Sequence, residues 1–437
     1  MKIRVTNFHK GRGGGHDTYV VSIARALAAR HEVFVGAPKT SRFLQHANAV
    51  SNIRALPMEF PAKLKELGRF VGAIRELRAL LKRERFDVVH VNGSLDHRLV
   101  MLATMFASFR RPYFVYTKHN TIRVKRDFVT KLKARRATHH VIAVSKPAAK
   151  LLEGSVYADC GMSVIANGVD IDFYAPFDDA LAARRRESLL GAAHAGKLVI
   201  GTITGFDWYK GTMDILAAVA ALPDELRRQM VLVVVGTEPN DGQRQVIESL
   251  NMSDTLLVTG FTDDVRSYVA TFDVGFMVSY AVESSSFACR EMMSMGRPVL
   301  VTRYASLPEN VDDGVDGWIV EPRDTHAMTE RLHTILANRN RLPGMGRSAR
   351  AKAHGPRSAL LLRGSHECCA TRRDIADVGD ALAVVPAPST GDDRVFAAAA
   401  RTCDQMPVER NADAVFEEIL GRLDDLAAVV GDVAEAS

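Results

Sequence analysis

The feature that most constrains this chain is a strand–helix rhythm that runs through it twice. In the first half, short apolar runs alternate with stretches whose apolar residues recur every three or four positions. This alternation predicts a parallel sheet wrapped by helices. The strand-like runs are Lys2–Phe8, His31–Ala37, Phe86–Asn92, Tyr113–Thr117 and His140–Ser145. The clearest helical stretches between them are Thr18–Ala29 and Leu64–Lys82.

The rhythm restarts after a polar, Ala-rich break over Tyr174–Gly196. The strand-like runs of the second half are Leu198–Thr204, Met230–Gly236, Leu256–Thr259, Val274–Val278, Val299–Thr302 and Trp318–Val320. We therefore expect an α/β protein with two Rossmann-like, doubly wound parallel-sheet domains, residues 1–170 and 171–346, facing a cleft. Ligands of such sheets bind beyond the carboxyl ends of the strands. Residues 347–437 form an atypical tail in which only 412–430 has the pattern of a helix.

The charge of the chain is strongly polarised. Residues 1–150 hold 30 Lys and Arg against 9 Asp and Glu, and the remainder holds 27 against 42. This imbalance indicates that the first half faces an anionic partner. No nucleic-acid-binding signature accompanies it, so we expect a membrane surface or a phosphorylated substrate and no nucleic acid. The stretch 123–136, with Lys125, Arg126, Lys131 and Lys133, has the mixed apolar and basic pattern of a helix lying on anionic lipid.

Membrane-spanning segments are not expected, because no apolar run reaches the ~18 residues that cross a bilayer. The first strand begins almost at Met1 and leaves no room for a signal peptide. We therefore expect a cytoplasmic protein, peripheral on the inner face of the membrane.

A glycine-rich loop follows the first strand and opens into a helix. Gly13, Gly14 and Gly15 allow backbone amides to approach a ligand, and a helix N-terminus favours an anion. The loop is therefore a candidate for binding a phosphate group or the acceptor, although a tight turn explains it equally well. Its spacing differs from Gly-x-Gly-x-x-Gly, and no acidic residue follows the second strand near Gly36, which speaks against a nicotinamide cofactor.

Two glutamates eight positions apart mark the second half. Glu283 lies in the loop before a predicted helix and Glu291 lies along that helix. The amides of Ser284, Ser285, Ser286 and Phe287 form a helix N-terminus suited to a diphosphate. A carboxylate such as Glu291 suits paired ribose hydroxyls, because it accepts two hydrogen bonds. A solvated helix face with two ordinary glutamates is the alternative.

These motifs lead to a family resemblance over roughly residues 1–345. Glu-x7-Glu followed by Met-x-x-Gly-x-Pro-Val resembles the donor-site signature of the family-four (group 1) retaining glycosyltransferases, which have the GT-B fold. Further matches in the same order are Asn167-Gly168-Val169-Asp170, Lys210-Gly211, Gly260-Phe261 and Pro308-Glu309-Asn310-Val311. One departure concerns the arginine usually found five residues before the lysine, which is Gly205 here.

The resemblance implies a role for several residues. Lys210 would bind the donor phosphates, Phe261 would line the base pocket, and the catalytic residues Glu283 and His119 would meet the donor sugar; His16 is a second candidate. It also implies a nucleoside-diphosphate sugar as substrate, an acceptor bound by the first domain, and no cofactor. No Asp-x-Asp ends an apolar strand, so no metal site is expected.

The predicted function is transfer of a sugar, with retention, from a UDP- or GDP-linked donor to a lipid-linked, lipopolysaccharide or polysaccharide acceptor. Two alternatives remain open at this point. One is a nucleotide-sugar 2-epimerase of the same fold, which needs acidic residues from both domains around the sugar. The other is an inactive nucleotide-sugar-binding partner subunit, indicated by Gly205 and by the serines after Glu283.

Overall fold

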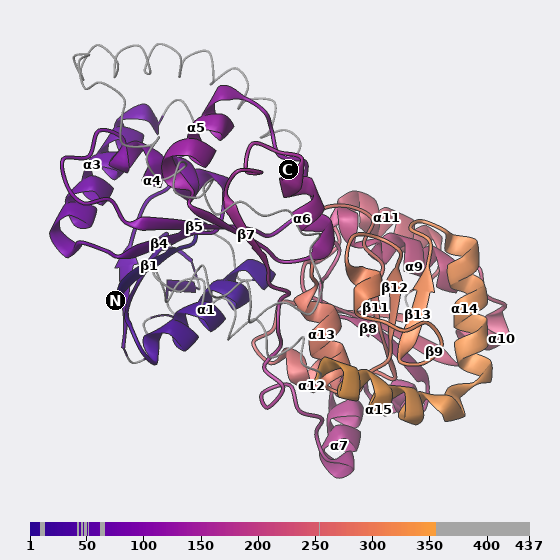
Figure 1. The fold of residues 1–437 in the computed structure, drawn as a ribbon. Helices are drawn as coiled ribbons and strands as arrows, with labels where there is room; N and C mark the ends of the chain where they lie inside the picture. Colours follow the sequence, from indigo (N-terminus) through magenta and orange to yellow (C-terminus); the bar gives the residue numbers. More distant parts are fainter. Residues whose placement is uncertain are drawn as a thin grey trace, which may run out of the picture.

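The computed structural model describes residues 1–8, 14–41, 43–44, 47, 50, 52–61, 66–252 and 254–354. Within these residues the chain forms two α/β domains side by side, the first in indigo to purple and the second in pink to orange (Figure 1). Gly13 and the helix expected over 412–430 lie outside the described residues.

The first domain contains a seven-stranded sheet in the order β3-β2-β1-β4-β5-β6-β7. All of its neighbouring strands are parallel. The strands are β1 (Lys2–Thr6), β2 (Glu32–Ala37), β3 (Ile53–Pro57), β4 (Val88–Val91), β5 (Tyr113–Lys118), β6 (His140–Ala143) and β7 (Gly161–Val164). Because β1 and β4 are neighbours, the chain reverses its winding direction between them, and the loops after these strands diverge to form a crevice.

The second domain repeats this plan with six parallel strands in the order β10-β9-β8-β11-β12-β13. The strands are β8 (Leu198–Thr202), β9 (Met230–Val235), β10 (Leu256–Gly260), β11 (Val274–Met277), β12 (Val299–Thr302) and β13 (Gly317–Val320). Here β8 and β11 are the neighbours at which the winding reverses, so the loops that follow them line the crevice of this domain.

Helices cover both faces of each sheet. Those of the first domain are α1 (Gly15–Ala28), α3 (Leu67–Glu84), α4 (Ser94–Thr104), α5 (Phe128–Ala137) and α6 (Lys146–Glu153). In Figure 1, α3, α4 and α5 lie above the first sheet and α1 lies below it. The later helices are α7 (Asp179–Leu190), α8 (Ala192–Ala195), α9 (Thr212–Ala220), α10 (Asp224–Arg227), α11 (Asp241–Ser249), α12 (Val265–Val269), α13 (Phe287–Ser294), α14 (Thr325–Ala337) and α15 (Leu342–Ala353). Three short 3-10 turns, Trp208–Lys210, Leu307–Glu309 and Arg339–Arg341, complete the described elements.

The expected pair of doubly wound parallel-sheet domains is confirmed, but the sequence missed two strands. β3 and β7 lie at the two edges of the first sheet, and most of their residues are partly or fully exposed. An edge strand is covered on fewer sides than a central one, so it needs no continuous apolar run. By contrast, β9 is buried along its whole length, and its sequence Met-Val-Leu-Val-Val-Val identifies it directly.

The Ala-rich break expected between the domains contains α7, which is fixed to the second domain. Arg186 donates to both carboxylate oxygens of Asp273 at 2.9 Å and to three backbone carbonyls. At the far end, Ala349 and Ala353 of α15 lie in the core of the second domain. That core therefore extends past residue 346, where we expected the tail to begin. Among the described residues, no helix is long and apolar enough to cross a membrane.

Candidate functional site

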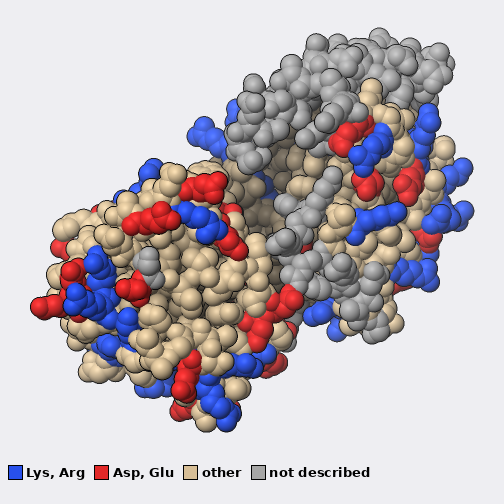
Figure 2. All heavy atoms as spheres, turned by 180° about the vertical axis from the view of Figure 1, so that it is seen from behind, with Lys and Arg blue, Asp and Glu red and all other residues tan. Residues whose placement is uncertain are grey.

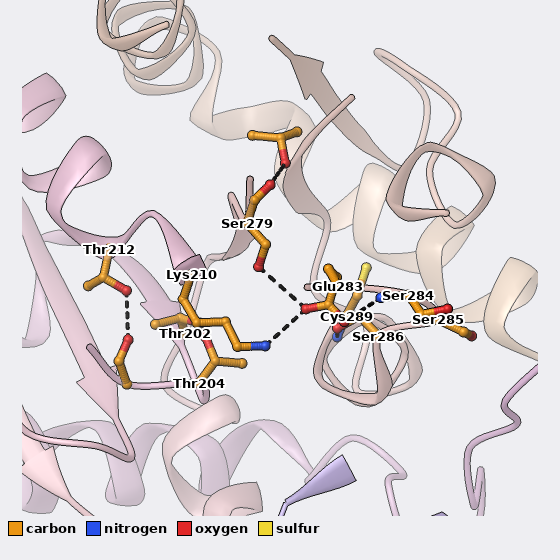
Figure 3. A network of polar contacts seen from close by, with 12 residues as sticks. Thr202, Thr204, Lys210, Thr212, Ser279, Glu283, Ser284, Ser285, Ser286 and Cys289 are labelled. Atoms are coloured by element: carbon orange, nitrogen blue, oxygen red, sulfur yellow. Dashed lines mark hydrogen bonds and ion pairs between the residues drawn. The ribbon is translucent and has the colours of Figure 1, made fainter. Parts of the chain in front are cut away.

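The second domain contributes an ion pair at the crevice. Lys210, at the end of the turn after β8, donates to Glu283 in the loop after β11 at 2.9 Å (Figure 3). The two side chains are only 14% and 11% exposed. Burial opposes the charge on Lys210, but Glu283 and Tyr209 outweigh it, and the pKa of Lys210 lies above its ordinary value. Lys210 is therefore a fixed positive charge held beside a carboxylate.

The backbone immediately before Glu283 is strained. Val282 has a φ of 60°, and the Glu283 amide donates to the Ala281 carbonyl at 2.7 Å across this one residue. A positive φ is rare for a β-branched residue, and such strain collects at ligand-binding sites. The turn aims the Glu283 carboxylate at Lys210, with Ser279 Oγ donating to the same oxygen at 3.4 Å.

The three serines after Glu283 lead into α13. Ser286 is the N-cap of the helix, and its hydroxyl accepts from the Cys289 amide. The Ser284 amide donates to the Glu283 side chain at 3.1 Å, so it is already occupied. The amides of Ser285, Ser286 and Phe287 are the ones that a diphosphate could reach at this helix N-terminus. The Ser285 hydroxyl is buried and has no hydrogen-bond partner among the described residues.

This same loop is bound to the first domain. Ser284 Oγ lies 3.0 Å from Ser145 Oγ, and Asn167 Nδ2 donates to the Ser285 carbonyl at 2.9 Å. Thr121 Oγ1 donates to the Glu283 carbonyl at 2.8 Å. Three residues of the loop are therefore held by three separate segments of the first domain, and the two crevices face each other.

Phe287 extends this attachment into the apolar interior. It belongs to the second domain by sequence, yet it is 8% exposed and packs in the main core cluster of the first domain. Its ring lies 3.2 Å from the position that a Cβ on Gly15 would take. Gly15, at the start of α1, therefore leaves room for the Phe287 ring. This role differs from the phosphate binding predicted for the glycine loop. Gly14, the N-cap of α1, is exposed and has a φ of 142°.

The first domain places His119 at the crevice, directly after β5. His119 Nε2 lies 3.1 Å from Asn92 Oδ1, and its ring lies 4.0 Å from the ring of His16. The Tyr19 ring meets it edge-on at 4.5 Å. The two histidines that the sequence singled out are therefore neighbours in one aromatic cluster.

Asn92 fixes the proton of His119. Its Nδ2 donates to the Thr6 carbonyl at 2.9 Å, and its backbone amide donates to Asp96 at 2.7 Å. Only an amide NH₂ can donate to a carbonyl, so the oxygen of Asn92 is the atom that faces His119. His119 Nε2 must then carry a hydrogen, which it donates to Asn92 Oδ1.

Gly205 occupies the position at which the resemblance would place an arginine. Its φ is 69°, and a Cβ would lie 2.1 Å from the Thr237 backbone nitrogen. No larger side chain fits this backbone, so the loop after β8 cannot hold an arginine in the conformation observed. Lys210 therefore has no cationic partner at this position.

Glu291, expected to bind ribose, lies in the second turn of α13 and is 7% exposed. Burial raises its pKa from the ordinary value of 4.5 to about 7, and a hydrogen bond with Tyr174 partly opposes this rise. Tyr174 follows the Asn167–Asp170 motif and was not singled out in the sequence. Phe261, expected in the base pocket, directly follows β10 and is 52% exposed.

The sequence missed the residues that hold the site together, chiefly Asn92, Thr121, Ser145 and Tyr174. Each is a common polar residue at the end of a strand or in a loop, and only the folded chain shows what it contacts. Asn167 was noted as part of a motif, but its cross-domain bond was not foreseen. Among the described residues, no group of three or more His, Cys, Asp and Glu is arranged to hold a metal ion.

Two family models match the chain, one in each domain. The model described as Glycosyltransferase Family 4 matches residues 13–173, and the model described as Glycosyl transferases group 1 matches residues 197–338. The two matched ranges contain Asn92, His119, Lys210 and Glu283, which the geometry brings to the crevice.

Curated relatives are identical to this chain at about a quarter of the aligned positions. D-inositol 3-phosphate glycosyltransferase of Corynebacterium jeikeium is 25% identical over 380 residues, which is 78% of this chain and 88% of the relative. UDP-Gal:alpha-D-GlcNAc-diphosphoundecaprenol alpha-1,3-galactosyltransferase of Escherichia coli is 25% identical over 285 residues, covering 61% and 72%. Among solved structures, Anabaena Alr3699/HepE in complex with UDP-glucose aligns with a TM-score of 0.70 at 20% identity and covers 87% of this chain and 100% of that chain.

The buried carboxyl of Glu291 predicts a pH-dependent stability. Its folded-state pKa lies above the ordinary value, so the folded state holds the proton more tightly, and stability falls as pH rises from about 4.5 to about 7. Glu291→Gln removes this loss. Between these two pH values, we expect the free energy of unfolding of the variant to rise by about 3 kcal/mol relative to that of the native protein. Urea unfolding followed by tryptophan fluorescence measures it, because Trp208 and Trp318 both lie in the second domain.

The matched control is Glu248→Gln, which removes a carboxylate from the exposed face of α11. If the free energies of unfolding of both variants change with pH as that of the native protein does, the Glu291 carboxyl does not destabilise the folded state when it ionises.

Proposed function

Because the chain belongs to the family 4, group 1 glycosyltransferases, we propose that it transfers a sugar from a UDP- or GDP-linked donor with retention of anomeric configuration. One observation carries this proposal. The largely buried ion pair of Lys210 and Glu283 lies beside the N-terminus of α13, and the loop that contains Glu283 is bonded to the domain that presents His119. A positive charge, helix amides and two polar side chains from opposite domains support the proposal.

The diphosphate of the donor is assigned to the positive end of this arrangement. Lys210 and the amides of Ser285 to Phe287 neutralise the charge that develops when the bond between the anomeric carbon and the phosphate oxygen breaks. The oxygen of an acceptor hydroxyl then takes the place of the phosphate oxygen on that carbon, and its proton leaves with the diphosphate. These groups supply the positive charge from the protein, so the proposal does not require a metal ion.

The sugar is assigned to His119 and Glu283, which come from opposite domains. Asn92 holds the His119 ring with Nε2 protonated, and the strained turn at Val282 holds the Glu283 carboxylate. Groups that are fixed before the substrate arrives need little reorganisation when the transition state forms. Glu291 is assigned to the ribose, where it can accept hydrogen bonds from the paired hydroxyls once it is ionised.

A panel of UDP- and GDP-sugars tests this proposal, with binding read by thermal shift and turnover by release of the nucleoside diphosphate in the presence of EDTA. Lys210→Met should weaken donor binding about tenfold or more, because a charge-assisted contact to the diphosphate is lost. Glu283→Gln should leave binding within a few-fold and lower kcat about a hundredfold. Lys197→Met, a partly exposed lysine of the same domain, is the control for loss of a positive charge.

Three other outcomes would each replace the proposal. Absence of binding and hydrolysis for every sugar in the panel rejects a nucleotide-sugar enzyme. Conversion of a donor to its 2-epimer without any acceptor favours the epimerase. Binding without turnover, in both the native protein and Glu283→Gln, favours an inactive partner subunit.

The acceptor is assigned to the first domain as a lipid-linked or phosphorylated glycan, of the kind used in lipopolysaccharide or polysaccharide synthesis. The excess of basic residues in this half supports the assignment. The E. coli relative named above acts, by its name, on a diphosphoundecaprenol-linked sugar. We place the enzyme at the cytoplasmic face of the membrane, where such an acceptor is exposed. Figure 2 shows the surface hollowed between the two domains, where donor and acceptor would meet.

The segment before and within α5 is the proposed lipid-facing surface. Lys125, Arg126 and Lys131 are exposed, and the apolar side chains of Ile122 and Phe128 beside them are 53% and 60% exposed. Lys133 was expected on this surface, and that expectation is wrong. It is only 7% exposed, and it donates to Ser94 Oγ at the start of α4.

Co-sedimentation with vesicles tests this surface. Binding to anionic vesicles should decrease with salt and with the triple substitution Lys125→Glu, Arg126→Glu and Lys131→Glu, because each basic residue near anionic lipid contributes about 1 kcal/mol. Arg185→Glu, on the exposed face of α7 in the second domain, should have little effect. Equal binding to neutral vesicles, or binding to neither kind, would remove the membrane from the proposal and leave a soluble acceptor.

A further inference from the structure

Two lysines of the first domain are buried and have no carboxylate partner among the residues that the structure describes. Lys118 ends β5 and Lys133 lies in α5, and each is 7% exposed. Lys118 Nζ donates to Asn120 Oδ1 at 2.5 Å, and Lys133 Nζ donates to Ser94 Oγ at 3.0 Å. Each ammonium group thus has one neutral partner, although it carries three donors, and neither forms an ion pair with a described residue.

Burying these two charges is unfavourable as the protein stands. Burial, followed by repulsion from Lys133, lowers the pKa of Lys118 from 10.5 to about 8. Burial also lowers the pKa of Lys133 to about 8, with Arg98 adding to the effect and Asp127 and Asp96 opposing it. A buried cation normally has a hydrogen-bonded anion beside it, and two buried lysines without one in the same domain are an exception that needs a physical reason.

The carboxylates nearby are engaged elsewhere. Asp127 caps α5 by accepting from the Thr130 amide at 2.7 Å. Asp96 accepts from Thr6 Oγ1 at 2.6 Å and from the Asn92 amide at 2.7 Å through one oxygen. Burial raises the pKa of Asp96 to about 6, and its hydrogen bonds with Thr6 and with the backbone of Asn92, His97 and Gly93 oppose this rise. Neither acid lies within ion-pair distance of a lysine in this cluster.

A helix N-terminus adds to the positive character of the same place. Ser94, the partner of Lys133, is the first residue of α4, and β4, which precedes α4, pairs with β5, which ends at Lys118. The N-cap of α4 is Gly93, which has no side chain to cap the helix, and the Asp96 carboxylate of the first turn accepts from the Gly93 and His97 amides. The helix dipole therefore favours an anion beside Ser94, the hydrogen-bond partner of Lys133.

This cluster lies on the acceptor side of the cleft. Lys118 is the residue before His119, and Thr121, three positions further on, donates to the Glu283 carbonyl across the cleft. A ligand group held by the lysines would therefore be close to the reacting centre but on the other domain from Lys210. A separate anion site for the second substrate fits this position.

We propose that Lys118, Lys133, Ser94 Oγ and the first amides of α4 bind a phosphate group carried by the acceptor. That the phosphate belongs to the acceptor depends on the proposed function, whereas the anion site itself is inferred from the buried lysines. Because both lysines are 7% exposed, the phosphate has to pass the exposed Ser94 to reach them and cannot remain at a membrane surface. The ligand class is therefore a phosphate ester on a sugar, a polyol or the linker of a lipid-linked glycan.

Calorimetric titration of the full chain with inorganic phosphate and with glycerol 3-phosphate tests the site. The titration is done with UDP present and is repeated with Lys210→Met. These two conditions exclude phosphate binding at the donor diphosphate site from the measured heat. We expect Lys118→Met and Lys133→Met each to weaken phosphate binding about tenfold or more, since a charge-assisted contact is lost. The matched control is Lys150→Met, which removes an exposed charge from α6 of the same domain and should bind phosphate as the native protein does.

Thermal stability separates this site from a structural role for the lysines. Methionine keeps the shape of the side chain and removes a buried charge, so Lys133→Met without phosphate should melt at the native temperature or above it. The rise of the melting temperature with added phosphate should be lost in this variant. A variant that melts lower than the native protein and still binds phosphate normally would show a structural lysine and overturn the proposal.

The remaining measurements distinguish a soluble phosphate ester from a lipid phosphate. They also test the phosphate site separately from the proposed transferase activity. Glycerol 3-phosphate should compete with inorganic phosphate; lysine-dependent binding only to vesicles containing phosphatidic acid would overturn the idea of a soluble ester entering the cleft. Failure of every nucleotide sugar to bind would remove the proposed transferase and leave the phosphate titration to stand alone. Normal donor turnover with phosphate binding unchanged in Lys118→Met and Lys133→Met would overturn the phosphate site only.

Discussion

The attachment of the loop after β11 to the opposite domain is the constraint on which the site depends. Ser284, Ser285 and the Glu283 carbonyl are each bonded to a different segment of the first domain, and the Phe287 ring completes the core of that domain against Gly15. Buried apolar contact and directional hydrogen bonds thus act on four residues within one short segment. Because α13 starts within this loop, its N-terminus is fixed relative to both sheets at once.

The two domains contribute lysines whose surroundings differ. Lys210 is paired with Glu283 and retains its proton, as the rise of its pKa indicates. Lys118 and Lys133 have no such partner, and burial lowers the pKa of both. The second domain thus holds a compensated cation and the first holds uncompensated ones. A donor diphosphate and an acceptor phosphate would meet these two environments from opposite sides of the same opening.

The sequence predicts most of the fold, because central strands and amphipathic helices have periodic patterns that are visible one residue at a time. The edge strands β3 and β7 escape this reasoning, since they are half-exposed. Lys133 was assigned to the surface because helical spacing alone does not show which face packs inward, and Ser94 lies far away in the sequence. The Glu-x7-Glu spacing located Glu283 and Glu291, but Asn92 and Tyr174 depend on three-dimensional contacts that no local pattern records. Gly205 could be recognised as a departure, whereas its steric cause needs the backbone of Thr237.

The most direct test of the account is whether His119 and Glu283 act on the same bound sugar. A double-mutant cycle on kcat/KM, with His119→Ala and Glu283→Gln alone and together, measures this coupling. If the two domains form one site, the double variant should be no more than about a few-fold worse than the poorer single variant, because the second removal acts on a transition state already lost. Losses that multiply in the double variant would show that the two residues act independently, and would contradict a shared site across the cleft.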